Sequence, residues 1–100
     1  MVTVGLLARL VAKPGKEDEV ATFLKSALPL AEAEGETVVW FAIRLSEREF
    51  GIFDAFPSDA GRKAHLSGPI AAALMAKAGE LLSEPPRIDS VEVLAAKLSK

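Results

Sequence analysis

The sequence predicts an α+β fold of the ferredoxin-like type, with the element order β-α-β-β-α-β and a four-stranded antiparallel sheet whose helices lie on one face. Two observations indicate this fold. The hydrophobic pattern along the 100 residues changes from β-like to helical and back, with turn residues between the segments. In the middle, two segments rich in β formers are separated only by residues 46–48, as in a hairpin. The length fits a single domain over residues 1–100.

The first strand and helix are expected in residues 2–35. Residues 2–12 are apolar and end at Lys13-Pro14-Gly15, which predicts a strand covered on both faces. From Lys16 the apolar residues follow a helical stripe, and residues 17–19 place acids in the first turn, where the helix dipole favours them. Pro29 should kink or end this helix, and residues 31–35 should close it.

Residues 37–45 and 49–56 are expected to form the hairpin. If Leu45 pairs with Glu49, alternation places on one face Trp40, Ala42, Arg44, Phe50, Ile52 and Asp54. The opposite face then holds only apolar side chains, namely Val39, Phe41, Ile43, Phe53 and Ala55. One side of the hairpin therefore combines an aromatic ring, a cation and a carboxylate.

The last third of the chain predicts two helical segments and a strand. Ser58 is a plausible N-cap for a short helix that ends at Leu66. Gly68 breaks that helix, and Pro69 fits the first turn of the next one, over residues 69–82. Residues 88–97 are expected to form the last strand.

A sheet with helices on one side should show polar residues on its other side, yet these strands are apolar on both faces. A second copy of the chain would cover the remaining face by packing sheet against sheet. We therefore expect a homodimer.

Composition excludes several classes of function. The formal net charge of −2 does not suit a protein that binds nucleic acid. The chain has no Cys and a single His, so no metal site is expected within one chain. The longest apolar stretch, residues 68–76, is too short to cross a membrane, and the N-terminus does not resemble a secretory signal. A cytoplasmic location is the expectation.

His65 and Asp54 are the candidate catalytic residues. His65 has the only side chain whose ordinary pKa lies near neutrality, which suits a proton acceptor, although a partly buried structural His is the alternative. Asp54 interrupts an apolar strand, where an unpaired carboxylate would be costly. It could orient His65, pair with Arg44, or accept a hydrogen bond from Trp40.

The candidate ligand-binding residues are on the same face of the hairpin. Trp40 could stack on a planar ligand or fill the core, and Arg44 could hold a phenolate or a carboxylate or be a solvent-exposed residue. Phe50, Ile52 and Phe56 could line a pocket or pack under the helices.

These segments resemble the antibiotic biosynthesis monooxygenase family of the dimeric α+β barrel superfamily. The similar features are Lys13-Pro14-Gly15 before an acidic helix, the hairpin VVWFAIR…FGIFDAF and the segment DAGRKAHLSG. The resemblance implies a dimeric α+β barrel. Members of the family include cofactor-independent enzymes that oxidise quinols or anthrones with molecular oxygen, and others that degrade haem.

The resemblance has departures. The chain has no Asn and no second His, which the haem-degrading members use, so haem degradation is not expected. Of the pocket residues in the anthrone oxidisers, the Tyr and Asn are missing, and only Trp40, Arg44 and His65 are available.

The resulting hypothesis is a homodimeric monooxygenase without a cofactor, which oxidises a small aromatic of the quinol or anthrone type. In this hypothesis His65 is the base, Arg44 stabilises the anion, and Trp40 is a planar wall. The alternative is a non-catalytic, ligand-binding or stress-associated dimer of the same fold.

Overall fold

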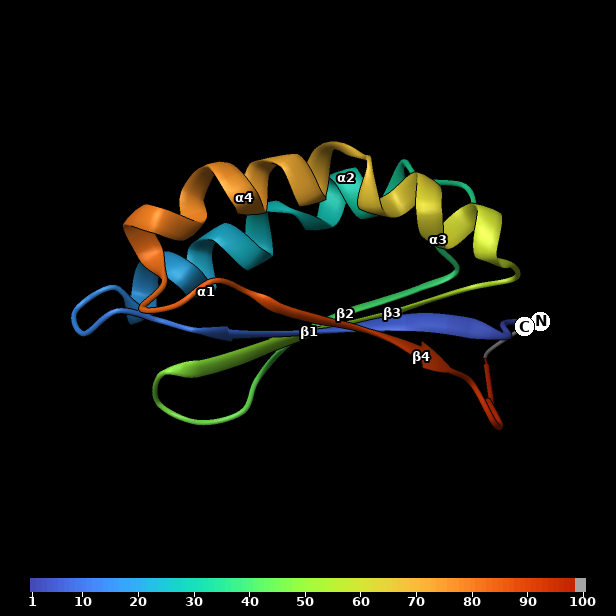
Figure 1. Ribbon diagram of the computed structural model, residues 1–100, viewed down its shortest axis with the longest axis horizontal. Helices are drawn as coiled ribbons and strands as arrows, with labels where there is room; N and C mark the ends of the chain where they lie inside the picture. The colour runs from blue at the N-terminus through green and yellow to red at the C-terminus, as the bar shows by residue number, and fades with distance from the viewer. Residues whose placement is uncertain (99–100) are drawn as a thin grey trace.

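Four antiparallel strands and four helices make up the described part of the chain, residues 1–98 of a computed structural model. The elements are β1 (Val4–Val11), α1 (Glu17–Ser26), α2 (Leu28–Glu32), β2 (Val39–Arg44), β3 (Glu49–Phe56), α3 (Asp59–Leu66), α4 (Pro69–Leu81) and β4 (Arg87–Glu92). The strands form one sheet in the order β2-β3-β1-β4. All four helices lie on the same side of it (Figure 1). The ferredoxin-like α+β fold is confirmed.

The hairpin has the predicted register. Trp40 pairs with Asp54, Ala42 with Ile52 and Arg44 with Phe50. The backbone N–H of Leu45 donates to the carbonyl of Glu49 at 2.8 Å, which closes the loop at the expected position. Because β3 also pairs with β1 along its whole length, it lies at the centre of the sheet, and the residues on its helix-facing side are buried.

Pro29 divides the first helical segment, as predicted. α1 ends at Ser26, and α2 begins at Leu28 with Pro29 in its first turn, where a missing N–H costs nothing. The apolar stripe of α1 packs on the sheet through Val20 and Leu24, which are 1% and 3% exposed. The chain after α2 turns back toward the sheet and reaches β2.

The last strand is shorter than predicted. β4 ends at Glu92, which pairs with Val4 at the start of β1, so residues 93–97 are not part of a strand. The physical reason is the length of the neighbouring strand. The N–H of Val93 makes one further hydrogen bond, to the carbonyl of Thr3. Beyond it, the segment before β1 offers almost no backbone with which residues 93–97 could pair.

The core lies between the sheet and the helices. The buried side chains from the strands include Leu6, Ala8, Leu10, Phe50, Ile52 and Phe56, and those from the helices include Val20, Leu24, Ile70, Leu74 and Leu81. The helix-facing side of the hairpin is therefore mostly core.

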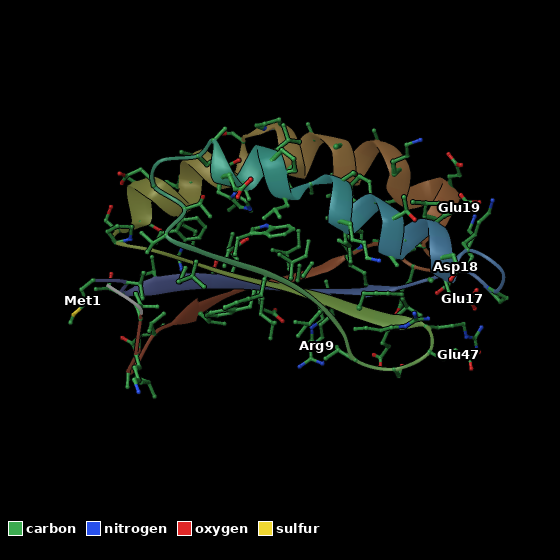
Figure 2. The ribbon with its side chains drawn as sticks, turned by 180° about the vertical axis from the view of Figure 1, so that it is seen from behind. Met1, Arg9, Glu17, Asp18, Glu19 and Glu47 are labelled. Carbon is green, nitrogen blue, oxygen red and sulfur yellow. The ribbon has the colours of Figure 1, made fainter. Side chains whose placement is uncertain are left out.

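We call the other side of the sheet the bare face; its apolar residues are Leu7, Val11, Val39, Phe41, Ile43, Phe53, Ala55 and Val91. Arg9 projects from this side, away from the helices (Figure 2). Phe41 is 59% exposed and Ile43 is 41% exposed. No helix of the described chain covers this surface, as the sequence predicts.

Within residues 1–98, none of the helices combines the length and the apolar character that a membrane span requires.

Candidate functional site

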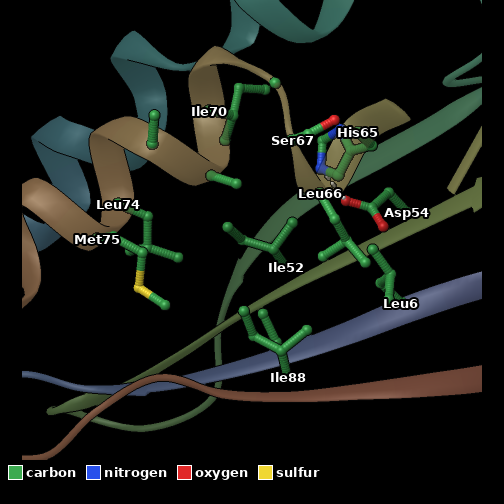
Figure 3. A pocket seen from close by; sticks show the side chains of 14 residues that line it. Leu6, Ile52, Asp54, His65, Leu66, Ser67, Ile70, Leu74, Met75 and Ile88 are labelled. Carbon is green, nitrogen blue, oxygen red and sulfur yellow. Dashed lines mark ion pairs between the residues drawn. The ribbon is translucent and has the colours of Figure 1, made fainter. Parts of the chain in front are cut away.

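A cavity of about 290 Å³ lies between the sheet and the helices α3 and α4. Its walls are mainly apolar side chains: Leu6 and Ala8 from β1, Ile52 from β3, Leu66 from α3, Ile70, Leu74 and Met75 from α4, and Ile88 from β4. Asp54 and His65 lie together at one end (Figure 3). An apolar chamber with a few convergent polar groups is the common form of a small-molecule site.

Asp54 reaches this cavity because of strand alternation. It follows Ile52 by two residues on β3, so both side chains point toward the helices. The residue is 2% exposed, and burial of a carboxylate is costly without partners. His65, in the last turn of α3, is that partner: its Nε2 lies 3.0 Å from Asp54 Oδ2.

A second carboxylate holds the other side of the His65 ring. The Nδ1 atom lies 2.5 Å from Glu34 Oε1. The ring also packs at a tilt against Phe56, with 5.5 Å between the two centroids. The imidazole of His65 is therefore fixed by two carboxylates and an aromatic ring, and is 7% exposed.

Glu34 is placed by a turn that follows α2. The N–H of Thr37 donates to the carbonyl of Glu34 at 3.1 Å, and the hydroxyl of Thr37 donates to Glu34 Oε1 at 2.7 Å. Gly68 lies close by: a Cβ there would be 3.2 Å from Glu34 Oε2. Glu34 was not predicted from the sequence as a site residue. It is one of several acids in a polar segment, and no pattern separates it from Glu32 or Glu36.

The two carboxylates determine the charge of His65. Burial alone would lower the pKa of His65, but the hydrogen bonds and charges of Asp54 and Glu34 outweigh it and raise the pKa to about 9. At neutral pH the ring is thus an imidazolium that donates to both carboxylates. In this charge state both nitrogens of His65 donate to carboxylates, so the ring has no free nitrogen with which to accept a proton from a ligand.

Asp54 keeps one oxygen without a partner. Its Oδ1 atom is buried and accepts no hydrogen bond from the described residues. The same holds for Glu34 Oε2. Asp54 borders the polar end of the cavity beside a cation, and its Oδ1 atom is an acceptor that still lacks a donor.

Arg44 does not reach the cavity. It lies at the end of β2, where its guanidinium donates to the carbonyls of Ser46 at 3.3 Å and Glu47 at 2.7 Å. It also stacks 5.0 Å from the centroid of the Phe50 ring. These contacts stabilise the hairpin loop, so Arg44 does not pair with Asp54 and is not placed to stabilise a ligand anion.

Of the other predicted binding residues, Ile52 lines the cavity, whereas Trp40, Phe50 and Phe56 are not among its lining residues. Phe50 and Phe56 are 2% and 0% exposed and belong to the core. Trp40 packs against the core clusters, and its buried Nε1 has no partner among residues 1–98, so it does not donate to Asp54. Of the three possible partners of Asp54, the structure shows His65.

No cluster of three or more His, Cys, Asp or Glu residues in the described chain is arranged to hold a metal ion.

Comparison with known proteins identifies relatives by structure. No protein-family model matches the chain, and no curated protein matches it. The crystal structure of NE2512, a protein of unknown function from Nitrosomonas europaea, superposes with a TM-score of 0.98; it is 58% identical over 100% of this chain and 97% of its own.

More distant structures share the fold. A candidate antibiotic biosynthesis monooxygenase from Nitrosomonas europaea has a TM-score of 0.81 at 11% identity, over 92% of this chain and 90% of its own. A second candidate monooxygenase of this type, from Caulobacter crescentus, has a TM-score of 0.71 at 18% identity, over 94% and 92% of the two chains. At such identities the similarity shows the fold alone. The 58% identity with NE2512, in contrast, shows the family: the chain belongs to the same protein family as NE2512 of Nitrosomonas europaea.

Proposed function

We propose that this protein binds a small, neutral aromatic molecule with a hydroxyl group in the cavity and oxidises it with molecular oxygen, without a cofactor. The observation that carries the proposal is Asp54 Oδ1, a buried acceptor without a partner at the end of an apolar cavity, beside the His65 imidazolium. The shared fold of two candidate monooxygenases supports the reaction class.

The charges of the site favour a neutral ligand. Asp54 and Glu34 together carry two negative charges and His65 one positive charge, so the cluster has a net charge of −1 at neutral pH. A carboxylate ligand would meet Asp54 in a medium of low dielectric constant and be repelled. A phenolic hydroxyl would instead donate to Asp54 Oδ1.

The volume of the cavity limits the size of the ring system. An apolar cavity of roughly 150 Å³ is large enough for benzene. A cavity of about 290 Å³ thus has room for one or two rings. Monocyclic and bicyclic quinols fit this space better than tricyclic anthrones, which narrows the substrate class that the sequence suggested.

The residues of the site suffice for the first chemical step. Asp54 takes the hydroxyl proton of the quinol, and the nearby positive charge of His65 stabilises the phenolate between mainly apolar walls. The electron-rich anion reduces oxygen: a C–O bond forms on the ring, and the O–O bond then breaks. Asp54 returns its proton to the departing oxygen atom, and the ring carbon that bound oxygen loses its own hydrogen as the second proton, so a quinol and oxygen give a hydroxylated quinone and water.

Oxygen uptake with a panel of hydroquinones and naphthohydroquinones tests the reaction. The proposal predicts uptake of one O₂ per substrate, the hydroxyquinone by mass spectrometry, and a loss of at least tenfold in Asp54→Asn. Substrate binding without uptake would instead support the alternative, a non-catalytic binding protein of the same fold. Equal activity of the wild type and Asp54→Asn would contradict the assigned base.

We also propose that two copies of the chain pair through the bare face. Its apolar side chains, above all Phe41 and Ile43, are exposed in a single copy, and sheets commonly pack face to face in two-fold dimers. Sedimentation analysis should give a dimer for the wild type and for Leu30→Ser, which removes an exposed apolar residue from α2. Phe41→Ser should give a weaker dimer. A monomeric wild type would overturn this assignment.

A further inference from the structure

The two carboxylates that hold His65 face different spaces. Asp54 borders the cavity described above, while Glu34 borders a second hollow of about 210 Å³, formed by the turn at residues 34–37 and by the junction of α3 and α4. His65 borders both spaces. A ligand in the cavity can thus contact Asp54 directly, but it meets Glu34 only through the imidazole ring.

This arrangement matters when the charge of Asp54 changes. A proton that moves from a ligand to Asp54 removes one of the two anions beside His65. The ring is 7% exposed, and a buried imidazolium without a counter-ion loses its proton readily. Glu34 remains in contact through Nδ1 and keeps its charge, because it does not touch the ligand.

We propose that Glu34 is a positioning residue that keeps His65 protonated and its ring oriented while Asp54 exchanges a proton with the ligand. This role rests on the proposed function of the cavity. It explains why the buried His65 ring has two carboxylate partners. Asp54 is already paired by His65, so Glu34 is not needed to compensate the burial of Asp54.

The surroundings of Glu34 fit this role. Thr37 donates its N–H to the backbone carbonyl of Glu34 and its hydroxyl to the carboxylate oxygen Oε1, and these bonds hold the Glu34 side chain in place. Asp54 from β3 and Glu34 are the two charged groups that act on His65. The cavity residues that β1 and α4 contribute are apolar, including Leu6 and Ile70. Glu36 lines the hollow but does not contact the ring, so it is a matched control.

The chain contains one histidine, so NMR titration of the imidazole resonances reports on this residue alone. Glu34→Gln should lower the pKa of His65 by about 1 to 3 pH units, the usual effect of one nearby opposite charge. Glu36→Gln should leave it unchanged. Thr37→Val, which keeps the charge but removes the hydroxyl, should shift it in the same direction by a smaller amount. An unchanged pKa in Glu34→Gln would overturn the proposal.

A coloured phenol tests the link to the ligand. 4-Nitrophenol absorbs visible light as its anion, so absorbance reports whether the bound molecule has given up its proton. Because the site favours a neutral ligand, 4-nitrophenol should enter as the neutral molecule, and the wild type should hold it as the anion with its proton on Asp54. In Glu34→Gln the charge of His65 is less well maintained, so a smaller fraction of the bound molecule should be the anion at the same pH. Equal anion fractions in the two proteins would contradict the role of Glu34.

The two measurements separate the two proposals. If neither protein binds 4-nitrophenol or any quinol, the proposed function fails, and the link between Glu34 and the ligand fails with it. If both proteins bind it alike and the pKa of His65 is unchanged in Glu34→Gln, the cavity function stands and the role of Glu34 is wrong.

Discussion

The ion cluster at His65 should make the stability of the fold depend on pH in a defined window. In the unfolded chain the pKa of His65 is 6.5, and in the folded protein it is raised to about 9. The folded state therefore holds its proton more tightly than the unfolded state does. The stabilisation is fully present below pH 6.5, declines as the pH rises, and is lost above pH 9.

The size of the effect follows from the gap between the two pKa values. Each pH unit between them is worth about 1.4 kcal/mol, so the gap corresponds to roughly 3 kcal/mol for a residue that is 7% exposed. In a domain of this length, 1 kcal/mol changes the melting temperature by about 4–8 °C. The melting temperature should therefore fall by roughly 12–24 °C from pH 6.5 to pH 9.

Thermal unfolding followed by circular dichroism at half-unit pH steps measures this decline. His65→Gln should abolish the part of the decline that belongs to this cluster. Because that variant leaves two buried carboxylates without a cation, the double variant His65→Gln with Asp54→Asn serves as a second comparison. Contributions from groups outside this cluster are common to all three proteins. A flat wild-type profile, or the same decline in both variants, would show that the His65 cluster does not control this pH dependence.

Two further predictions concern packing. Gly61→Ala should destabilise the protein by about 1–3 kcal/mol, because the new Cβ would lie 3.0 Å from the Cβ of Glu36. Gly79→Ala places a Cβ with no neighbour within 4 Å, so it should stabilise α4 by about 0.5–1 kcal/mol. Denaturant unfolding measures both, and equal effects would contradict the close approach of α3 to the turn. Ala71→Phe should fill the cavity and weaken ligand binding at least tenfold by calorimetry, while Ala76→Phe, an exposed position on α4 that does not line the cavity, should bind normally.

Most of the fold could be predicted because its signals are local. The three-residue loop and the alternation of the hairpin fixed its register, so Trp40 opposite Asp54 followed from the sequence. Pro29 marked the break between α1 and α2. The end of β4 was predicted wrongly because it depends on where β1 begins, which is a property of the neighbouring strand rather than of residues 93–97.

The candidate site could be predicted only in part. Asp54 stood out because a carboxylate in an apolar strand needs a partner, and His65 is one of the few side chains that can supply it. The contacts of Arg44 could not be predicted because its nearest acceptors are loop carbonyls, which sequence patterns do not show. Glu34 gave no signal, since its place beside His65 depends on the path of the chain after α2.

Binding by calorimetry of 2-naphthol, naphthalene and 2-naphthoate tests most directly that a buried acceptor beside a cation recognises a neutral hydroxyl group. The three molecules share one ring system and differ in what they present to Asp54. We expect the highest affinity for 2-naphthol, less for naphthalene and least for 2-naphthoate, with the advantage of 2-naphthol reduced in Asp54→Asn. Tightest binding of 2-naphthoate, or equal affinities for all three, would contradict it.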